Sequence, residues 1–362
     1  MIYSASSYRA EYYYHDSKLY FRRQGLFIVL GAVLMVLVSL IDYRFYLKKM
    51  RFIKIRPIVI LYFLCLLFHV YAFFKGHESG GSRRWIELGG GFNFQPSEIS
   101  KVCFVLLAAF LAGKRKRLVN TGSFFKNILG FILLFLFFVP ILGIVAAQNL
   151  SSAIILAGIV SVIIFCVSMD KKYIIVVFFM MVGAVILFIA LKAYRSERIM
   201  HFMYPESMDP GDQILQGLYA IASGGLFGKG LGNSVQKLGN IPEVHTDMIF
   251  TIICEELGII GGIALIGLFL LLLWRIFKIA LNAPDIYGAL IATGVFAQLS
   301  VQIIMNIAVV TNSIPATGVP LPFVSYGGSS LVIMLAEIGI VLSVSKRTKD
   351  VIEEEDEEEF EE

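Results

Sequence analysis

The stretch ILGFILLFLFFVPILGIVAA, residues Ile128–Ala147, contains no charged side chain. A helix needs about 20 predominantly apolar residues to cross the hydrocarbon core of a bilayer. The stretch therefore predicts a transmembrane helix and places the chain among integral membrane proteins.

Similar apolar runs recur along the chain. Hydrophobic residues make up 57% of the 362 positions and charged residues 16%, a balance unlike that of a soluble domain. We expect an all-α polytopic membrane protein with about nine transmembrane helices. The other predicted spans are Gly25–Ile41, Pro57–Phe74, Glu98–Gly113, Ser152–Met169, Tyr173–Leu191, Met248–Trp274, Ile286–Ala308 and Ser329–Val344.

Positive charge is concentrated in the short loops on one side of the predicted spans. Segments 42–56 and 114–127 carry six and five Lys or Arg residues, whereas the loop between Ala308 and Gly328 carries none. Cytoplasmic loops are enriched in Lys and Arg, so the charged side and the C-terminus are predicted to be cytoplasmic. The net charge of +4 reflects this sidedness, and no nucleic-acid partner is expected.

The chain divides into three predicted segments. Residues 1–24 form an extracytoplasmic N-terminal segment, 25–345 the transmembrane domain, and 346–362 an acidic cytoplasmic tail. The tail ends in EEEDEEEFEE, whose like charges repel one another, so we expect it to be disordered. The four cysteines fall within predicted spans, where apolar packing is favoured over a disulfide.

Two extracytoplasmic loops are candidates for function, residues 76–97 and 192–246. Long ordered loops usually carry function. The second contains SGGLFGKGLGN (Ser223–Asn233), whose glycines permit turns that other residues resist. A flexible linker is the alternative for this segment, and an interfacial anchor is the alternative for Trp85 in the first loop.

Four ionisable residues fall inside predicted spans, and each is a functional-site hypothesis because charge is costly in lipid. They are Lys101, Glu255, Glu256 and Glu337. Glu98 and Lys101 lie three residues apart on one helical face, where a structural ion pair and a functional pair are both open. Glu255 is predicted to line any cavity that leads inward from Asp247, whereas Glu256 points to the opposite side.

Asp247 stands at the start of a predicted span. Thr246 and Asp247 can cap the helix N-terminus, where the helix dipole favours a carboxylate. With His245 alongside, the same dipole keeps Asp247 ionised and able to accept a proton. Capping and catalysis are compatible roles here.

Three long motifs carry a family resemblance. They are RRWIELGGGFNFQPSEISK (Arg83–Lys101), SGGLFGKGLGNSVQKLGNIPEVHTDMIFTIICEELG (Ser223–Gly258) and NIAVVTNSIPATGVPLPFVSYGGSS (Asn306–Ser330). Together they resemble the signatures of the SEDS family of shape, elongation, division and sporulation proteins, in family order. The third motif resembles the division-type FtsW and sporulation-type SpoVE branch more than the elongation-type RodA branch.

The resemblance implies a peptidoglycan glycosyltransferase of the bacterial cytoplasmic membrane. The family polymerises lipid II, an undecaprenyl-pyrophosphate-linked disaccharide pentapeptide, and works with a class B penicillin-binding protein and other division proteins. Its essential aspartate falls on Asp247 here, and the glutamate and lysine of its QPSExxK motif fall on Glu98 and Lys101.

The resemblance also implies the residues of a substrate cavity. They are Arg84, Trp85, Gln95, Ser97, Gln148, His245, Thr246, Pro322, Ser325 and Tyr326. Sugar transfer from a pyrophosphate needs a base for the acceptor hydroxyl and cations for the leaving group. We expect Asp247 to be that base and Lys101, Arg84, Lys229 and Lys237 to face the pyrophosphate. No cofactor is certain, although a divalent cation such as magnesium or manganese could assist.

The chain departs from the family pattern at three places. Gln148–Ser152 lacks the usual proline and acid, and Asn312 replaces a usual glycine, which asparagine can imitate in a left-handed conformation. The first residues resemble the sequence that follows the family's first helix, so nine spans are expected here against ten in the family.

Two rival functions remain open from the sequence. A lipid II flippase would use the same intramembrane charges, with Glu337 as the residue in its favour. A non-catalytic scaffold for division proteins would need no base at Asp247.

Overall fold

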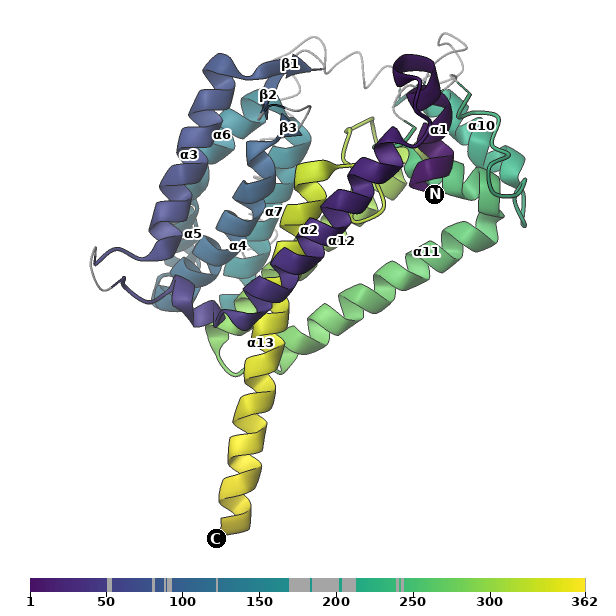
Figure 1. Cartoon of the computed structure of the whole chain (residues 1–362). Coiled ribbons are helices and arrows are strands. Elements are labelled where there is room, and N and C mark those ends of the chain that lie inside the picture. The colour runs from purple at the N-terminus through teal and green to yellow at the C-terminus, as the bar shows by residue number, and fades with distance from the viewer. Residues whose placement is uncertain are drawn as a thin grey trace. The chain divides into compact units, whose positions relative to one another are not determined.

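A computed structural model describes residues 1–50, 54–79, 82–87, 89, 93–121, 123–168, 183, 202–203, 213–238, 241 and 244–361. Most of these residues are helical, as the apolar runs predict (Figure 1). The helices are α1 Ile2–Tyr14, α2 Leu19–Leu40, α3 Pro57–Lys75, α4 Pro96–Lys114, α5 Phe124–Phe135, α6 Val139–Gln148, α7 Leu150–Val167, α10 Gln213–Gly224, α11 Ile249–Leu281, α12 Ile286–Val310 and α13 Gly328–Glu361. Short 3₁₀ turns occupy Tyr43–Tyr46, Lys116–Val119 and Leu136–Phe138.

Eight helices of the described residues are long and apolar enough to cross a membrane, and they confirm eight of the nine predicted spans. The chain is thus a multi-pass membrane protein. The predicted span Tyr173–Leu191 lies outside the described residues, apart from Gly183. One span is composite, because α5 passes through a 3₁₀ turn into α6. Pro140 falls in the first turn of α6, where its missing N–H costs no intrahelical hydrogen bond.

The chain folds into two compact units, each described here by itself. Unit 1 comprises residues 1–29, 187–273 and 299–331, and unit 2 comprises residues 30–186, 274–298 and 332–362. The predicted boundaries after residues 24 and 345 stay predictions.

The core of unit 2 is built around α4. This helix packs against α3 and α7, and α6 packs against both of those (Figure 1). Small and apolar residues of α4 are almost completely buried from Cys103 to Ala109, and Phe104 meets Phe138 edge to face at 4.8 Å. The helix is surrounded by protein rather than lipid, which explains how it can carry Glu98 and Lys101.

The loop 76–97 contains a small antiparallel sheet that the sequence does not predict. Strands β1 (His77–Ser79), β2 (Ser82–Glu87) and β3 (Asn93–Phe94) pair in the order β1-β2-β3. Trp85 lies opposite His77, and Ile86 lies opposite Phe94. Because β3 ends two residues before α4, the sheet fixes how the chain enters that helix.

Helix α13 is drawn from its membrane span to Glu361. Extending an existing helix avoids the cost of nucleation. The predicted disorder of the acidic tail at 346–362 stays a prediction.

In unit 1, helix α11 is broken at Gly258, where φ is 70° and ψ is −173°. The loop that follows α10 packs against this break. Ile259 and Ile260 donate backbone hydrogen bonds to the carbonyls of Gly225 and Leu226. A side chain at position 258 would collide with the Leu226 carbonyl, so only glycine fits the crossing.

We predict that Gly258→Ala destabilises the protein by about 2 kcal/mol or more, because it adds both a strained backbone and a backbone collision. Thermal unfolding in detergent measures this. Gly267→Ala is the matched control, since Gly267 lies in the same helix and no atom lies within 4 Å of its added methyl. Equal melting temperatures for the two variants would contradict the account of the break.

Candidate active site

The backbone around Asp247 is held by the segment 306–326. The carbonyls of His245, Thr246 and Asp247 are three consecutive acceptors. They receive hydrogen bonds from Tyr326 N at 2.8 Å, Ser325 Oγ at 2.5 Å and Asn306 Nδ2 at 2.7 Å, in that order. The second and third motifs of the sequence therefore meet at the turn that carries Asp247.

Asn306 and Ser325, which hold the turn, also bond to other residues of the segment 306–326. Asn306 Nδ2 also donates to the Val319 carbonyl at 2.8 Å, and Ser325 Oγ accepts from Leu321 N at 2.8 Å. Asn306 is almost completely buried, where each polar contact contributes more than it does in water. The turn at 245–247 is thus positioned through its backbone carbonyls.

The carboxylate of Asp247 is half-buried and lies two residues before α11 begins. Its Oδ1 accepts from Gln213 Nε2 at 3.4 Å and from Thr246 Oγ1 at 3.3 Å. Gly318 has a φ of 64°, and an added Cβ there would lie 3.7 Å from Asp247 Oδ2. A side chain at position 318 would therefore contact the carboxylate.

Three rings adjoin the turn in unit 1. Tyr20 lies 4.6 Å from the His245 ring and 4.9 Å from the Tyr326 ring, between ring centroids. Burial raises the pKa of Tyr326 above its ordinary value. Asn312, within the segment 306–326, has a φ of 49°, which confirms the predicted left-handed conformation.

Two fully buried glutamates hold the loop that precedes the turn. Glu255 pairs with Lys229 at 2.7 Å and also accepts from Ser234 Oγ and Val235 N. Glu256 pairs with Lys237 at 2.8 Å.

Both acids thus face the loop 229–237, which Figure 1 shows after α10. Glu255 orders this loop, and its predicted place in a substrate cavity stays a prediction. Lys229 and Lys237 likewise stabilise the loop through these ion pairs. Their predicted contact with pyrophosphate stays a prediction.

In unit 2, the Glu98–Lys101 pair exists, with Nζ and Oε2 2.9 Å apart and both side chains more than 90% buried. Gln298 Nε2 donates to Glu337 at 2.6 Å. Both pairs are buried, and each acid there has a hydrogen-bond donor, as burial of charge in a membrane protein requires.

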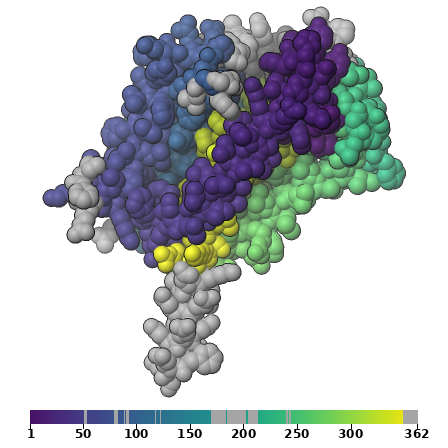
Figure 2. Space-filling model, viewed as in Figure 1, coloured from purple at the N-terminus to yellow at the C-terminus, as the bar shows by residue number. Residues whose placement is uncertain are grey.

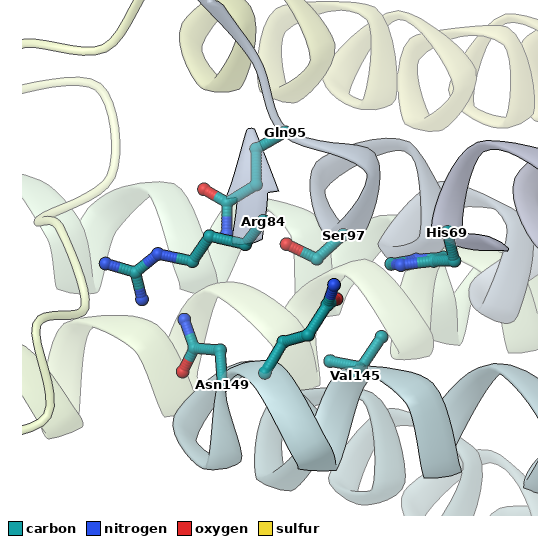
Figure 3. Close-up of a pocket in the computed structure, with 7 residues that line it drawn as sticks. His69, Arg84, Gln95, Ser97, Val145 and Asn149 are labelled. Carbon is teal, nitrogen blue, oxygen red and sulfur yellow. The ribbon is translucent and has the colours of Figure 1, made fainter. Parts of the chain in front are cut away.

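A small cavity of ≈ 10 Å³ in unit 2 gathers four of the residues implied by the family resemblance (Figure 3). Its lining residues are His69, Arg84, Gln95, Ser97, Val145, Gln148 and Asn149. Gln148 donates to the Arg83 carbonyl at 2.5 Å, which joins α6 to β2. Ser97 Oγ and His69 Nδ1 are buried and have no hydrogen-bond partner in the described part of the chain. The cavity has room for about one water.

The structure therefore sorts the predicted residues into two groups. Unit 1 holds Asp247, His245, Thr246, Lys229, Lys237, Glu255, Pro322, Ser325 and Tyr326, and unit 2 holds Arg84, Trp85, Gln95, Ser97, Glu98, Lys101 and Gln148.

The sequence does not predict Gln213, Asn306 and Gly318 beside Asp247, or His69 and Asn149 in the cavity. Asn306 opens the third motif and could have been singled out as a polar residue inside a predicted span.

No cluster of three or more His, Cys, Asp or Glu side chains that could hold a metal ion occurs among the residues the structure describes. The four cysteines form no disulfide, and three of them are buried. A divalent cation at this site stays a prediction.

Comparisons with known proteins agree on one family. The model of the cell cycle proteins FtsW, RodA and SpoVE matches residues 1–350. Stage V sporulation protein E of Bacillus subtilis is 37% identical over 352 residues, which cover 96% of this chain and 93% of that protein. A probable peptidoglycan glycosyltransferase FtsW of Geobacter sp. is 35% identical, with the same coverage.

Solved structures agree as well. A chain from a peptidoglycan synthase complex that coordinates polymerization and crosslinking aligns with a TM-score of 0.72 and 27% identity, over 91% of this chain and 90% of that chain. The RodA rod shape determining protein of Thermus thermophilus aligns with a TM-score of 0.64 and 26% identity, over 95% and 93%.

We predict that Lys237→Met costs about 3 kcal/mol of stability, because it leaves the Glu256 charge buried without its partner. Adding Glu256→Gln should recover much of that loss. Thermal unfolding in detergent measures both, with the exposed Lys18→Met as control. If Lys237→Met melts like Lys18→Met, the pair does not hold the loop.

Proposed function

Since the chain belongs to the family of FtsW, RodA and SpoVE cell cycle proteins, we infer that it is a membrane-embedded peptidoglycan glycosyltransferase. Its substrate under this proposal is lipid II, which it joins into glycan strands. The observation that carries the proposal is the half-buried carboxylate of Asp247 on a turn clamped at three consecutive carbonyls.

Asp247 acts as general base in the proposed reaction. Its carboxylate takes the proton from the 4-hydroxyl of the acceptor N-acetylglucosamine. The oxygen attacks C1 of the muramyl residue at the donor chain's end, and the bond from C1 to the undecaprenyl pyrophosphate breaks. One base with inversion at C1 suffices, so a second carboxylate at hydrolase spacing is not required.

Three features around Asp247 support this role. The turn's backbone is fixed by Asn306, Ser325 and Tyr326, so the base does not need to reorganise. The position of Asp247 just before α11 favours an ionised carboxylate through the helix dipole. Gly318 places no side chain against Oδ2.

The leaving pyrophosphate needs cationic partners. Within unit 1 we assign Lys229 to this task, because its side chain is 32% exposed despite its pairing with Glu255. Lys101 and Lys237 are 5% and 7% exposed, and the predicted roles of Arg84, Lys101 and Lys237 stay predictions. A magnesium or manganese ion bound with the substrate would supply further positive charge.

The proposed setting is the bacterial cytoplasmic membrane, with Asp247 on the extracytoplasmic face and the C-terminus in the cytoplasm. The Lys and Arg bias of the loops supports this orientation. The proposed partner is a class B penicillin-binding protein that crosslinks the strands. Similarity to one chain of a peptidoglycan synthase complex supports that partnership.

We predict that Asp247→Asn lowers the rate of lipid II polymerisation by purified protein about 10²- to 10⁴-fold, as expected for loss of a general base. Gel analysis of labelled glycan strands measures the rate. Asp16→Asn, at an exposed ion pair of unit 1, is the control. Full activity of Asp247→Asn would refute the assignment, and lipid II translocation without polymerisation by the unmodified protein would favour a flippase.

We predict that Ser325→Ala lowers kcat about tenfold and changes KM little, because it removes one clamp on the turn and no predicted cation. Ser330→Ala is the matched control, since among the described residues the Ser330 hydroxyl donates to the nearby Gly327 carbonyl alone. A rise in KM alone would indicate substrate binding by Ser325 instead of positioning.

A further inference from the structure

Unit 1 contains a cavity of ≈ 380 Å³ that the catalytic proposal does not use. Helix α1 forms one wall, and we call this space the α1 cavity. Its lining residues are Ala5, Tyr8, Arg9, Tyr12, Tyr13, Lys237, Ile241 and Val244. Binding sites for small ligands typically occupy about 300–1,000 Å³, so the α1 cavity is large enough for one.

The wall formed by α1 is aromatic, and it is not part of the apolar core. Tyr8, Tyr12 and Tyr13 keep 43%, 69% and 63% of their surface exposed, while small residues of α1, Ala5 among them, face inward. Tyr8 stacks on Tyr12 at 6.5 Å, and Tyr12 meets Tyr13 edge to face at 5.1 Å. Figure 2 shows the segment, in dark purple, at the surface. Such rings offer apolar faces and hydroxyl groups at little entropic cost.

Arg9 places a cation in the α1 cavity. Its guanidinium lies 5.7 Å from the Tyr13 ring, and its Nη1 is buried with no hydrogen-bond partner in the described residues. No carboxylate within the described part of the chain lies within ion-pair distance of Arg9. Lys237 is already neutralised by Glu256. A buried guanidinium donor is costly unless an acceptor reaches it, so the cavity favours an anionic ligand.

The α1 cavity is coupled to the segment that carries the proposed base. Ser4 of α1 donates to Glu256 at 2.6 Å, and Lys237 Nζ donates to Ser4 Oγ at 3.0 Å. Val244 lines the cavity three residues before Asp247, and three residues of extended chain span at most about 11 Å. A strand engaged at Asp247 could therefore reach the cavity.

We propose that the α1 cavity binds the growing glycan strand, with sugar rings on the tyrosine faces and a stem-peptide carboxylate on Arg9. This rests on the proposed function, because that reaction makes such a strand. An anionic lipid fits less well. Attraction to lipid headgroups uses clusters of basic residues, whereas α1 carries one arginine and one glutamate, Arg9 and Glu11.

The test measures binding without turnover. Purified Asp247→Asn protein in detergent is titrated with lipid-free, uncrosslinked glycan oligomers that carry pentapeptides and a fluorescent label. We expect binding that weakens about tenfold or more when Arg9→Gln is added, and less with Arg9→Lys. Arg22→Gln removes a positive charge from an exposed pair outside the cavity and should change nothing. Neutral chitotetraose should bind more weakly.

Three results would overturn the proposal. They are no binding of the glycan, equal binding by Arg9→Gln, or an Arg9-dependent affinity for phosphatidylglycerol vesicles with glycan affinity unchanged. Arg9→Lys keeps the charge and guards against a folding defect in Arg9→Gln. Polymerisation by the unmodified protein is measured separately, so failure of the catalytic proposal and failure of this one are distinguishable.

Discussion

The hydrogen bonds from Asn306, Ser325 and Tyr326 to three consecutive carbonyls are the constraint on which the candidate site depends. They join two motifs that are some 60 to 80 residues apart in the chain. These bonds hold the turn through its backbone, and the turn carries the proposed base. Thr246 and Asp247 are half-buried.

A second constraint acts from the preceding loop. Glu255 and Glu256 are completely buried, and both face the loop between residues 229 and 237. The break at Gly258 lets the loop backbone bond to the backbone of α11 on either side of it, from Glu255 to Ile260. The two glutamates, whose charges would be costly in lipid, thereby hold the loop that precedes the proposed base. The proposed base, two residues before α11, thus lies close in sequence to Glu255 and Glu256 in the first turns of that helix.

The apolar runs predict the helices well, because a span must satisfy its backbone hydrogen bonds internally. The left-handed Asn312 and the Glu98–Lys101 pair follow from local chemistry. Contacts between distant segments do not follow from local chemistry. No spacing rule predicts that Lys237 meets Glu256, which in turn binds Ser4. The sheet in 77–94 depends on tertiary context, which composition alone does not reveal.

The central claim is that the Asp247 carboxylate receives the acceptor's proton. A structure of the Asp247→Asn variant with two lipid II molecules bound tests it most directly. The account predicts that the side chain at position 247 lies about 2.6–3.2 Å from the acceptor's 4-hydroxyl, directly or through one water. A 4-hydroxyl beyond that reach, with a different carboxylate beside it, would contradict the account.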